Sequence, residues 1–388
     1  MNRPETRRQI LLTAAVGSTL ALGDSRVWAT ATKNQPQMLA RWAAWQVFRQ
    51  QFITKEGRVV DIGSPRSQTF SEGQGYALFF ALVADDRETF EKVLNWTENN
   101  LCGGDMTARL PAWLWGRRDD DTWGVLDGNS ASDSDLWIAY ALGEAARLWN
   151  DRRYRALSSL ISARILREET ATLPTLGLSL LPAAKGFAET PGRWRLNPSY
   201  MPLQLMRWFS ANEPDPRWAL LAESSLKIIK GSAPNGFAPD WIIFDAQLGF
   251  LPDIGGSEKG QGAYNAIRVY LWAGMLHTQA PERAALLAKF TPMISHIRNF
   301  GHPPESVNIL NGKAERPGPI GFSAAVLPLL DAVGDKRTLK MQLDRLQAKP
   351  LRPDEYYGQV LSLFGRGWLD GFYRFAANGR LLPQWKSK

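Results

Sequence analysis

The sequence of 388 residues contains one cysteine and three histidines. Cys102 has no second cysteine with which to form an intrachain disulfide. So few Cys and His side chains also leave little material for a zinc site or a Cys–His nucleophile. Low-complexity tracts and long runs of one charge are missing as well, which excludes disordered and fibrous proteins. An enzyme with this composition depends on carboxylates, and we expect no metal or other cofactor.

The basic residues are scattered along the chain. The formal net charge is +8 at pH 7, yet no block of five or more Lys and Arg residues occurs. This distribution indicates a solvated basic surface and not a nucleic-acid-binding stripe. Beyond the N-terminal region no apolar segment reaches the ~20 residues of a membrane span. We therefore expect neither a nucleic-acid partner nor stable membrane insertion.

The N-terminal region has the features of an export signal. The twin-arginine pair Arg7-Arg8 precedes an apolar stretch, and Ala29-Thr30-Ala31 has the form of a cleavage signal. We predict a Tat-type signal peptide over 1–31 and a single domain over 32–388. The expected location is the periplasm or the outside of the cell.

Helical periodicity dominates the remaining sequence. Short polar or Pro-containing turns separate many helices, which favours antiparallel neighbours. The first helices of successive hairpins start 58 to 68 residues apart, and this spacing predicts a ring or solenoid of helix pairs. The predicted helices cover 35–53, 72–84, 87–100, 132–149, 151–169, 200–212, 214–231, 258–277, 281–299, 319–333, 336–348 and 354–375.

The longer connections differ in composition from the helices. They contain many of the Gly, Pro and Trp residues, and the chain has 16 Trp against 9 Tyr. In a ring these connections would gather at one end and build a cleft. A short strand is expected at Trp241-Ile242-Ile243-Phe244. The connections are 54–71, 103–131, 182–199 and 232–257.

Carboxylates stand at two predicted helix starts. Thr69 followed by Glu72 fits a capping box, which is one explanation of Glu72. The alternative is a general acid, which must hold its proton, although a helix N-terminus favours the charged form. This alternative requires burial or a second carboxylate nearby. Asp133 and Asp135 follow Ser132, which can cap the next helix, and either aspartate is a candidate partner for Glu72.

A third helix start contains Tyr264, Asn265 and Arg268. Arg268 is expected to pair with a nearby Asp, and Tyr264 is either a core ring or part of the site. Aromatic residues in the loops beside the carboxylates can stack on the apolar faces of pyranose rings. The candidate platforms are Trp113, Trp115 and Trp194.

Five motifs resemble glycoside hydrolase family 8, and within it the endoglucanases encoded with bacterial cellulose synthase. Ser134 departs from the small Ala or Gly usual at its position. The resemblance implies an all-α (α/α)6 barrel of about twelve helices and inverting hydrolysis of β-1,4-glucan. The motifs are Ser71-Glu72-Gly73-Gln74, the segment 131–149, Asn197-Pro198-Ser199-Tyr200, the segment 264–268 and Glu355-Tyr356-Tyr357-Gly358.

The resemblance also implies roles for individual residues. Glu72 would be the proton donor, and Asp133 would bind the central sugar. The expected partners are a β-1,4-glucan chain and the cellulose synthase and export complex. The other expected substrate contacts are Trp113, Trp115, Asp135, Trp194, Tyr200, Tyr264, Arg268, Tyr356 and Tyr357.

Asn265 departs from the family pattern, which has the general-base aspartate there. An amide cannot accept a proton from water as a carboxylate can. The chain is therefore an Asp→Asn variant, a natural lineage with another base, or a weakly catalytic glucan-binding subunit. A chitosanase, xylanase or lichenase, or a helical scaffold that binds protein, are further alternatives. The substitute bases are Asp133, Asp135, Asp240, Asp245 and Glu258.

Overall fold

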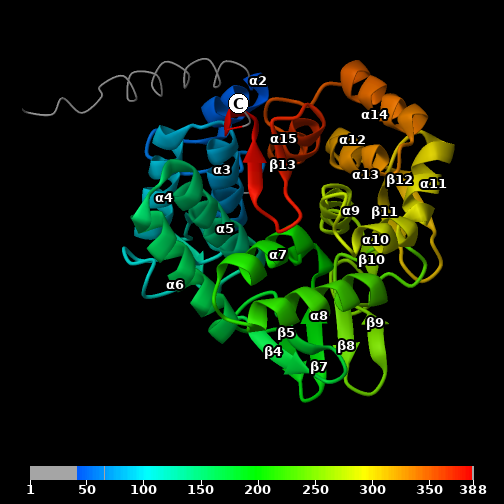
Figure 1. Ribbon diagram of the computed structural model, residues 1–388, viewed down its shortest axis with the longest axis horizontal. Helices are drawn as coiled ribbons and strands as arrows, with labels where there is room; N and C mark the ends of the chain where they lie inside the picture. Colours follow the sequence, from blue (N-terminus) through cyan, green and yellow to red (C-terminus); the bar gives the residue numbers. More distant parts are fainter. Residues whose placement is uncertain (1–41, 65, 387–388) are drawn as a thin grey trace, which may run out of the picture.

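The computed structural model describes residues 42–64 and 66–386, and the predicted signal peptide lies outside them. The described chain forms an (α/α)6 barrel, in which an inner ring of helices is surrounded by an outer one (Figure 1). The inner helices are α3 (Ser71–Val83), α5 (Ser132–Trp149), α7 (Leu203–Asn212), α9 (Ala266–Gly274), α12 (Ile320–Ala325) with α13 (Leu327–Ala332), and α15 (Tyr356–Leu369). The outer helices are α2 (Ala43–Phe52), α4 (Arg87–Leu101), α6 (Arg152–Glu168), α8 (Arg217–Gly231), α10 (Arg283–Lys289) with α11 (Thr291–Phe300), and α14 (Lys336–Ala348).

Side-chain burial separates the two rings. In α3 every residue except Glu72 is buried, whereas α14 buries only Thr338 and Gln342. A helix that is apolar all round packs inside, and an amphipathic one covers it. Phe364 of α15 closes the inner ring, because its centroid lies 4.6 Å from that of Phe80 in α3. None of the helices in residues 42–64 and 66–386 is both long and apolar enough for a membrane span.

Close packing inside the ring requires glycine at the crossing of α12 and α15. A Cβ atom on Gly365 would lie 1.8 Å from the carbonyl oxygen of Ala324. No larger residue fits without moving one of the two helices. This contact fixes the distance between two inner helices.

Short antiparallel strands occupy the connections. Several lead directly into inner helices and therefore place the long connections at the N-terminal end of that ring. The sheets are β1 (Thr69–Phe70), β2 (Leu114–Arg117) and β3 (Trp123–Asp127); β6 (Ala188–Thr190), β7 (Arg193–Leu196), β8 (Ile242–Asp245) and β9 (Gly249–Pro252); and β10 (Gln261–Gly262), β11 (Pro304–Asn308) and β12 (Ala314–Pro317). Two hairpins pair β4 (Thr170–Leu173) with β5 (Gly177–Leu180) and β13 (Tyr373–Phe375) with β14 (Leu381–Pro383); the 3-10 turns are η1 (Pro198–Tyr200) and η2 (Gln384–Lys386).

The β13–β14 hairpin covers the opposite end of the inner ring. Figure 1 shows it across the middle of the ring of helices. The hydroxyl of Tyr140 in α5 donates a hydrogen bond to the carbonyl oxygen of Gly379 in this hairpin, at 2.8 Å. The two ends of the barrel are therefore built differently: connections at one, a hairpin at the other.

The predicted helix over 258–277 is too long. It begins only at Ala266, because Gln261 and Gly262 pair with β11 instead. A Cβ atom on Gly262 would lie 1.9 Å from the carbonyl oxygen of Ala238, so this strand requires glycine. The apolar periodicity of the sequence carries no information about that backbone contact.

Three other predicted helices are divided or shortened. The segments 281–299 and 319–333 each form two helices, with Pro292 and Pro328 at the starts of the second ones. Proline lacks the N–H group that a continuous helix needs. The segment 354–375 ends its helix at Leu369, and its last residues form β13.

Candidate active site

Glu72 lies in the first turn of α3, with its side chain 25% exposed. The hydroxyl of Tyr76, one turn later, donates to Glu72 Oε1 at 3.0 Å. The predicted capping box is wrong, because Phe70 is the N-cap and Thr69 donates its hydroxyl hydrogen to the carbonyl oxygen of Val59. The carboxyl group of Glu72 therefore faces other side chains and not its own helix end.

Asp133 lies in the first turn of α5 and is 3% exposed. Its Oδ1 accepts the backbone N–H of Ser134 at 2.8 Å. Ser132 does not cap this helix as predicted, because Ala131 is the N-cap and makes no side-chain cap bond. The hydroxyl oxygens of Ser134 and Ser71 are 2.7 Å apart, and this hydrogen bond connects the two helix starts.

Arg268, in the first turn of α9, lies between the carboxyl groups of Glu72 and Asp133. Its Nη1 lies 3.1 Å from Glu72 Oε1, and its Nη2 lies 3.7 Å from Asp133 Oδ2. The expected pairing of Arg268 with an aspartate is confirmed. At 5% exposure the guanidinium is held by neutral groups as well. They are Ser199 Oγ at 3.0 Å, Asn265 Oδ1 at 2.9 Å and Tyr357 OH at 3.2 Å.

Burial determines the protonation of Asp133. Burial and then the neighbouring Glu72 carboxylate raise the pKa of Asp133 to about 8, although the Arg268 guanidinium opposes the shift. Asp133 therefore holds a proton at neutral pH. It does so next to Glu72, the more exposed carboxyl group of the two.

Asn265 lies at the start of α9 beside Arg268. Its Oδ1 accepts from Arg268 Nη2, so one of the two lone pairs of the amide oxygen is engaged. Its backbone N–H donates to Asp240 Oδ1 at 2.9 Å. The same Asp240 oxygen accepts the N–H groups of Ala263 and Ala266, at 2.8 Å and 2.7 Å. Asp240, which is 2% exposed, therefore anchors the segment that carries Asn265.

The other substitute bases lie in different surroundings. Asp245 accepts two backbone N–H groups in an exposed turn, and Glu258 faces Arg195 at 3.5 Å. Asp135 has no exposed surface. It cannot touch a glucan chain in this structure, so the prediction that it contacts substrate is wrong. Of the four weaker candidates, Asp240 is the one bound to the Asn265 backbone.

Of the four predicted tyrosines, Tyr264 and Tyr357 meet beside Arg268, and Tyr200 lies beside Trp241. Tyr264 is 46% exposed, donates to Glu305 Oε1 at 3.0 Å, and is not a core ring. The Tyr357 hydroxyl donates to the Tyr264 carbonyl oxygen at 2.5 Å. Tyr356 is 8% exposed and packs on Phe52 with ring centroids 5.4 Å apart. The Tyr356 ring packs in the core, but its hydroxyl group lies beside Gly73, the residue after Glu72. Contact between Tyr356 and substrate therefore stays a prediction.

Trp113 and Trp115 differ in their surroundings. The carbonyl oxygen of Trp113 accepts the N–H of Ser71 at 3.0 Å, which places Trp113 beside the turn that carries Glu72. Trp115 stacks on Trp123 at 5.2 Å, and the Arg58 guanidinium lies 4.4 Å from the Trp115 ring centroid. Protein side chains thus occupy ring surface of Trp115 that a sugar would need. Trp123, 47% exposed, is more accessible.

Trp194 packs against Phe244, its partner in the neighbouring strand β8. Its ring lies 6.3 Å from that of Phe244 and packs against the core. The next residue, Arg195, points to the opposite face of β7 and lies 4.0 Å above the Trp241 ring. The role of Trp194 as a sugar platform stays a prediction.

Two further aromatic residues, Trp241 and Phe187, are not among the predicted platforms. Their rings stack with centroids 5.7 Å apart, and Trp241 also meets Tyr200 at 6.0 Å. Both are partly exposed. The available signal was the position of Trp241 directly after Asp240 and before an apolar strand.

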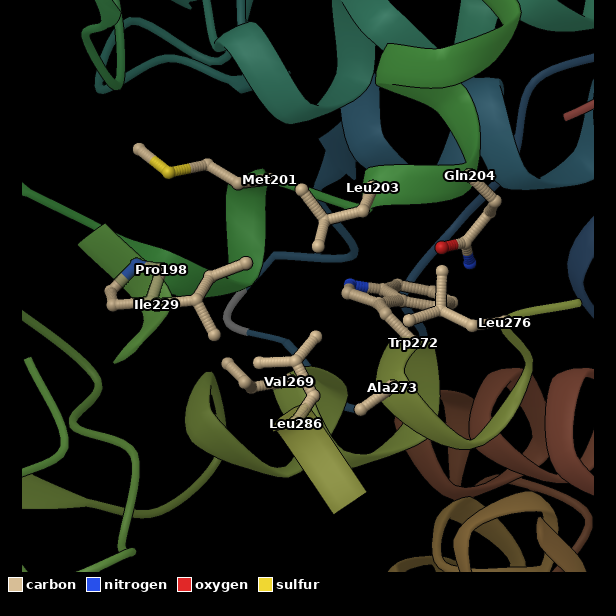
Figure 2. A pocket seen from close by; sticks show the side chains of 10 residues that line it. All are labelled: Pro198, Met201, Leu203, Gln204, Ile229, Val269, Trp272, Ala273, Leu276 and Leu286. Atoms are coloured by element: carbon tan, nitrogen blue, oxygen red, sulfur yellow. The ribbon is translucent and has the colours of Figure 1, made fainter. Parts of the chain in front are cut away.

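A separate small cavity lies behind η1. Figure 2 shows its lining, in which the Trp272 ring and the Gln204 amide lie close to Leu276. No acidic residue lines it, so it is unsuited to acid–base chemistry. Among residues 42–64 and 66–386, no three His, Cys, Asp or Glu residues are arranged to hold a metal ion. The carboxyl groups around Arg268, and not this cavity, are the candidate active site. The residues that line the small cavity are Pro198, Met201, Leu203, Gln204, Ile229, Val269, Trp272, Ala273, Leu276 and Leu286.

Comparisons with known proteins identify the family. Residues 25–371 match the model of glycosyl hydrolases family 8. An endoglucanase of Salmonella typhi is 44% identical over 93% of this chain and 96% of its own length. An endoglucanase of Xanthomonas axonopodis pv. citri is 44% identical over 98% of both. The crystal structure of an endo-1,4-D-glucanase from Vibrio fischeri superposes with a TM-score of 0.82 at 45% identity, covering 89% of this chain and 99% of that one. The chain belongs to glycosyl hydrolase family 8.

Proposed function

We propose that the protein is an endo-1,4-β-glucanase that hydrolyses internal β-1,4-glucosidic bonds of cellulose with inversion. The observation that carries this proposal is the Glu72–Asp133 pair. Arg268 bridges the two residues at the N-terminal end of the inner ring of helices. Two carboxyl groups of different exposure suit glycoside hydrolysis, which needs a proton at the leaving oxygen. The relatives named endoglucanase support the same activity.

Glu72 is the proton donor in this proposal. The proton belongs to the pair, because Asp133 holds it at neutral pH and lies next to Glu72. Glu72 is the more accessible member and delivers the proton to the glycosidic oxygen. Asp133 binds the central sugar, and Arg268, Tyr200 and Tyr264 shape the space around that sugar.

Activation of water is the weak step of the proposed reaction. The Asn265 oxygen is engaged by Arg268, and its NH₂ group can hold a water molecule but cannot take a proton. Asp240 is the alternative base with direct contact to this segment. We propose that the chain hydrolyses glucan slowly, with Asn265 as the cause.

The cellular setting is also part of the proposal. The twin-arginine pattern in residues 1–31 supports export to the periplasm or beyond. A periplasmic glucanase would act on the glucan chain that a cellulose synthase and export complex delivers. Co-purification with that complex would test this part independently of activity.

The deciding experiment measures new reducing ends from soluble cellulose for this chain, Glu72→Gln and Asn265→Asp. Glu72→Gln should lower the rate about 10²- to 10⁴-fold, the usual range for general acid–base catalysis. Asn265→Asp should raise it by about 10²-fold or more. An unchanged rate in Glu72→Gln would overturn the assignment of the acid.

Two further outcomes are informative. If the unaltered chain already cuts as fast as Asn265→Asp, another base exists, and Asp240→Asn should then abolish the activity. If none of the proteins cuts but all bind cello-oligosaccharides, the chain is a glucan-binding subunit. Chitosan, xylan and mixed-linkage glucan serve as competing substrates, and faster cleavage of one of these would replace cellulose in the proposal.

A further inference from the structure

Asp135 and Glu169 are two buried carboxyl groups that interact with each other and with Asp133. Asp135 lies in the first turn of α5, Glu169 is the C-cap of α6, and both have no exposed surface. Ser130 donates its hydroxyl hydrogen to Glu169 Oε1 at 2.6 Å. Both oxygens of Asp135, and Glu169 Oε2, are buried without a hydrogen-bond donor from any described residue.

Two ionised carboxylates are strongly unfavourable in this place. The titratable groups near the pair include Asp133 and Glu168, which are acidic as well, and the buried Cys102 thiol near Asp135. Arg164 and Arg167 are bound to Glu168 at 2.7 Å and 2.6 Å. A single proton removes the conflict, because it turns one carboxylate oxygen into a donor for the other residue.

The pair lies where the start of α5 is attached to the rest of the protein. The N–H of Leu181 donates to the Glu169 carbonyl oxygen at 2.8 Å, and the N–H of Ser132 donates to the Pro182 carbonyl oxygen at 2.9 Å. The N–H of Ala184 binds Ser130 Oγ at 3.1 Å. The same short segment therefore contacts the acid pair and the turn that carries Asp133.

We propose that Asp135 and Glu169 share one proton, and that this hydrogen-bonded acid pair positions the first turn of α5 so that Asp133 stays beside Glu72. Neither residue touches substrate, and both are positioning residues. The shared proton is a statement about the protein alone, whereas the effect on glucan rests on the proposed function.

The shared proton can be tested without any activity. Burial raises the pKa of Asp135 and raises that of Glu169 to about 8. A raised carboxyl pKa gives stability that is complete below the unfolded-state value and is lost as the pH rises toward 8. Each such proton changes the folding constant about tenfold per pH unit.

The experiment measures urea unfolding of the full chain from pH 5 to pH 8.5. Glu169→Gln places an amide donor beside Asp135. The unfolding free energy of this variant should therefore fall less steeply with pH than that of the unaltered chain, and the difference in slope should correspond to one proton. Asp133→Asn should remove a different proton. The control is Glu223→Gln, at an exposed position on α8, which should keep the full slope.

Infrared spectra give a second readout. A protonated carboxylic acid band should be present at pH 6.5 and weaker in Glu169→Gln and in Asp135→Asn. An unchanged band and an unchanged pH slope in both variants would overturn the shared proton. If the shared proton is present, the alkaline decline of cello-oligosaccharide affinity should become shallower in Glu169→Gln; an unchanged decline would overturn the positioning role alone. Absence of glucan binding by the unaltered chain would contradict the proposed function and not the acid pair.

Discussion

Helix α5 carries a buried carboxyl group near each of its ends, and the two groups have opposite surroundings. Asp133 at the start shares Arg268 with a second carboxyl group, Glu72. Glu144, three turns later, is fully buried and accepts hydrogen bonds from Arg147, from Trp208 Nε1 at 2.6 Å and from the N–H of Leu381 at 2.7 Å. Asp133 has too few hydrogen-bond donors, whereas Glu144 has donors on both of its oxygens.

The difference separates chemistry from structure. Glu144, whose oxygens accept from Arg147, Trp208 and the N–H of Leu381, fastens the β13–β14 hairpin to the barrel. A carboxyl group that must share its cation with another acid retains a proton that it can give up. The hairpin end therefore provides stability, and the connection end provides reactivity.

The largest expected effect comes from the arginines of the two ends. Arg268→Lys replaces a fork that contacts two acids by a single point charge, so hydrolysis should slow about 10²- to 10³-fold. Arg147→Lys is the matched control and should lower stability but leave the rate within a few-fold. Reducing-end assays and urea unfolding on both variants separate the outcomes. A similar rate loss in both would remove the distinction between the two ends.

A smaller effect is expected from pH. The Asp133 pKa of about 8 means that the active pair loses its proton above that pH. The rate on soluble cellulose should then fall about tenfold for each further pH unit. The measurement is kcat/KM between pH 5 and pH 10. A flat profile up to pH 10 would show that the proton of Asp133 is not used.

Glu144→Gln tests the structural end. One oxygen becomes an NH₂ group, so a donor from Trp208 or Leu381 loses its acceptor and Arg147 loses its counter-charge. The free energy of unfolding should drop by about 2 kcal/mol. Urea unfolding at pH 6 and pH 8 should give the same loss, and the rate should be retained. A loss of activity without a loss of stability would assign Glu144 to the chemistry.

The sequence predicted those parts of the fold that depend on local pattern. The helix over 132–149 and the one over 336–348 have the predicted bounds, because apolar periodicity and flanking turns define them. The predicted start of α9 was wrong because Gly262 lies against the backbone of Ala238, which is 24 residues away in the chain. Such contacts leave no periodic signal.

The candidate site was predicted unevenly for a similar reason. Glu72, Asp133 and Arg268 stand in family motifs, and the structure brings them together. Asp135 was misassigned because residues two apart on a helix point to different sides, so Asp133 and Asp135 cannot both face the cleft. Its partner Glu169 comes from another helix end and has no motif.

The smallest expected effect concerns Ser134, at the position where the family pattern has Ala or Gly. Ser134 donates to the Ala131 carbonyl oxygen at 2.9 Å, so in its contact with Ser71 it is Ser71 that donates. Ser134→Ala leaves the buried Ser71 hydroxyl without its acceptor. The free energy of unfolding should fall by about 1 kcal/mol, and the rate by less than tenfold, because the distance between Glu72 and Asp133 is less well fixed.

The double variant Ser71→Ala/Ser134→Ala decides what this hydrogen bond does. Removing both partners leaves no unsatisfied hydroxyl, so stability should recover toward that of the unaltered chain. The rate should not recover, because the connection between the two helix starts is still missing. Recovery of both stability and rate would mean that the bond only satisfies two buried hydroxyl groups, and that Arg268 alone holds the two carboxyl groups together.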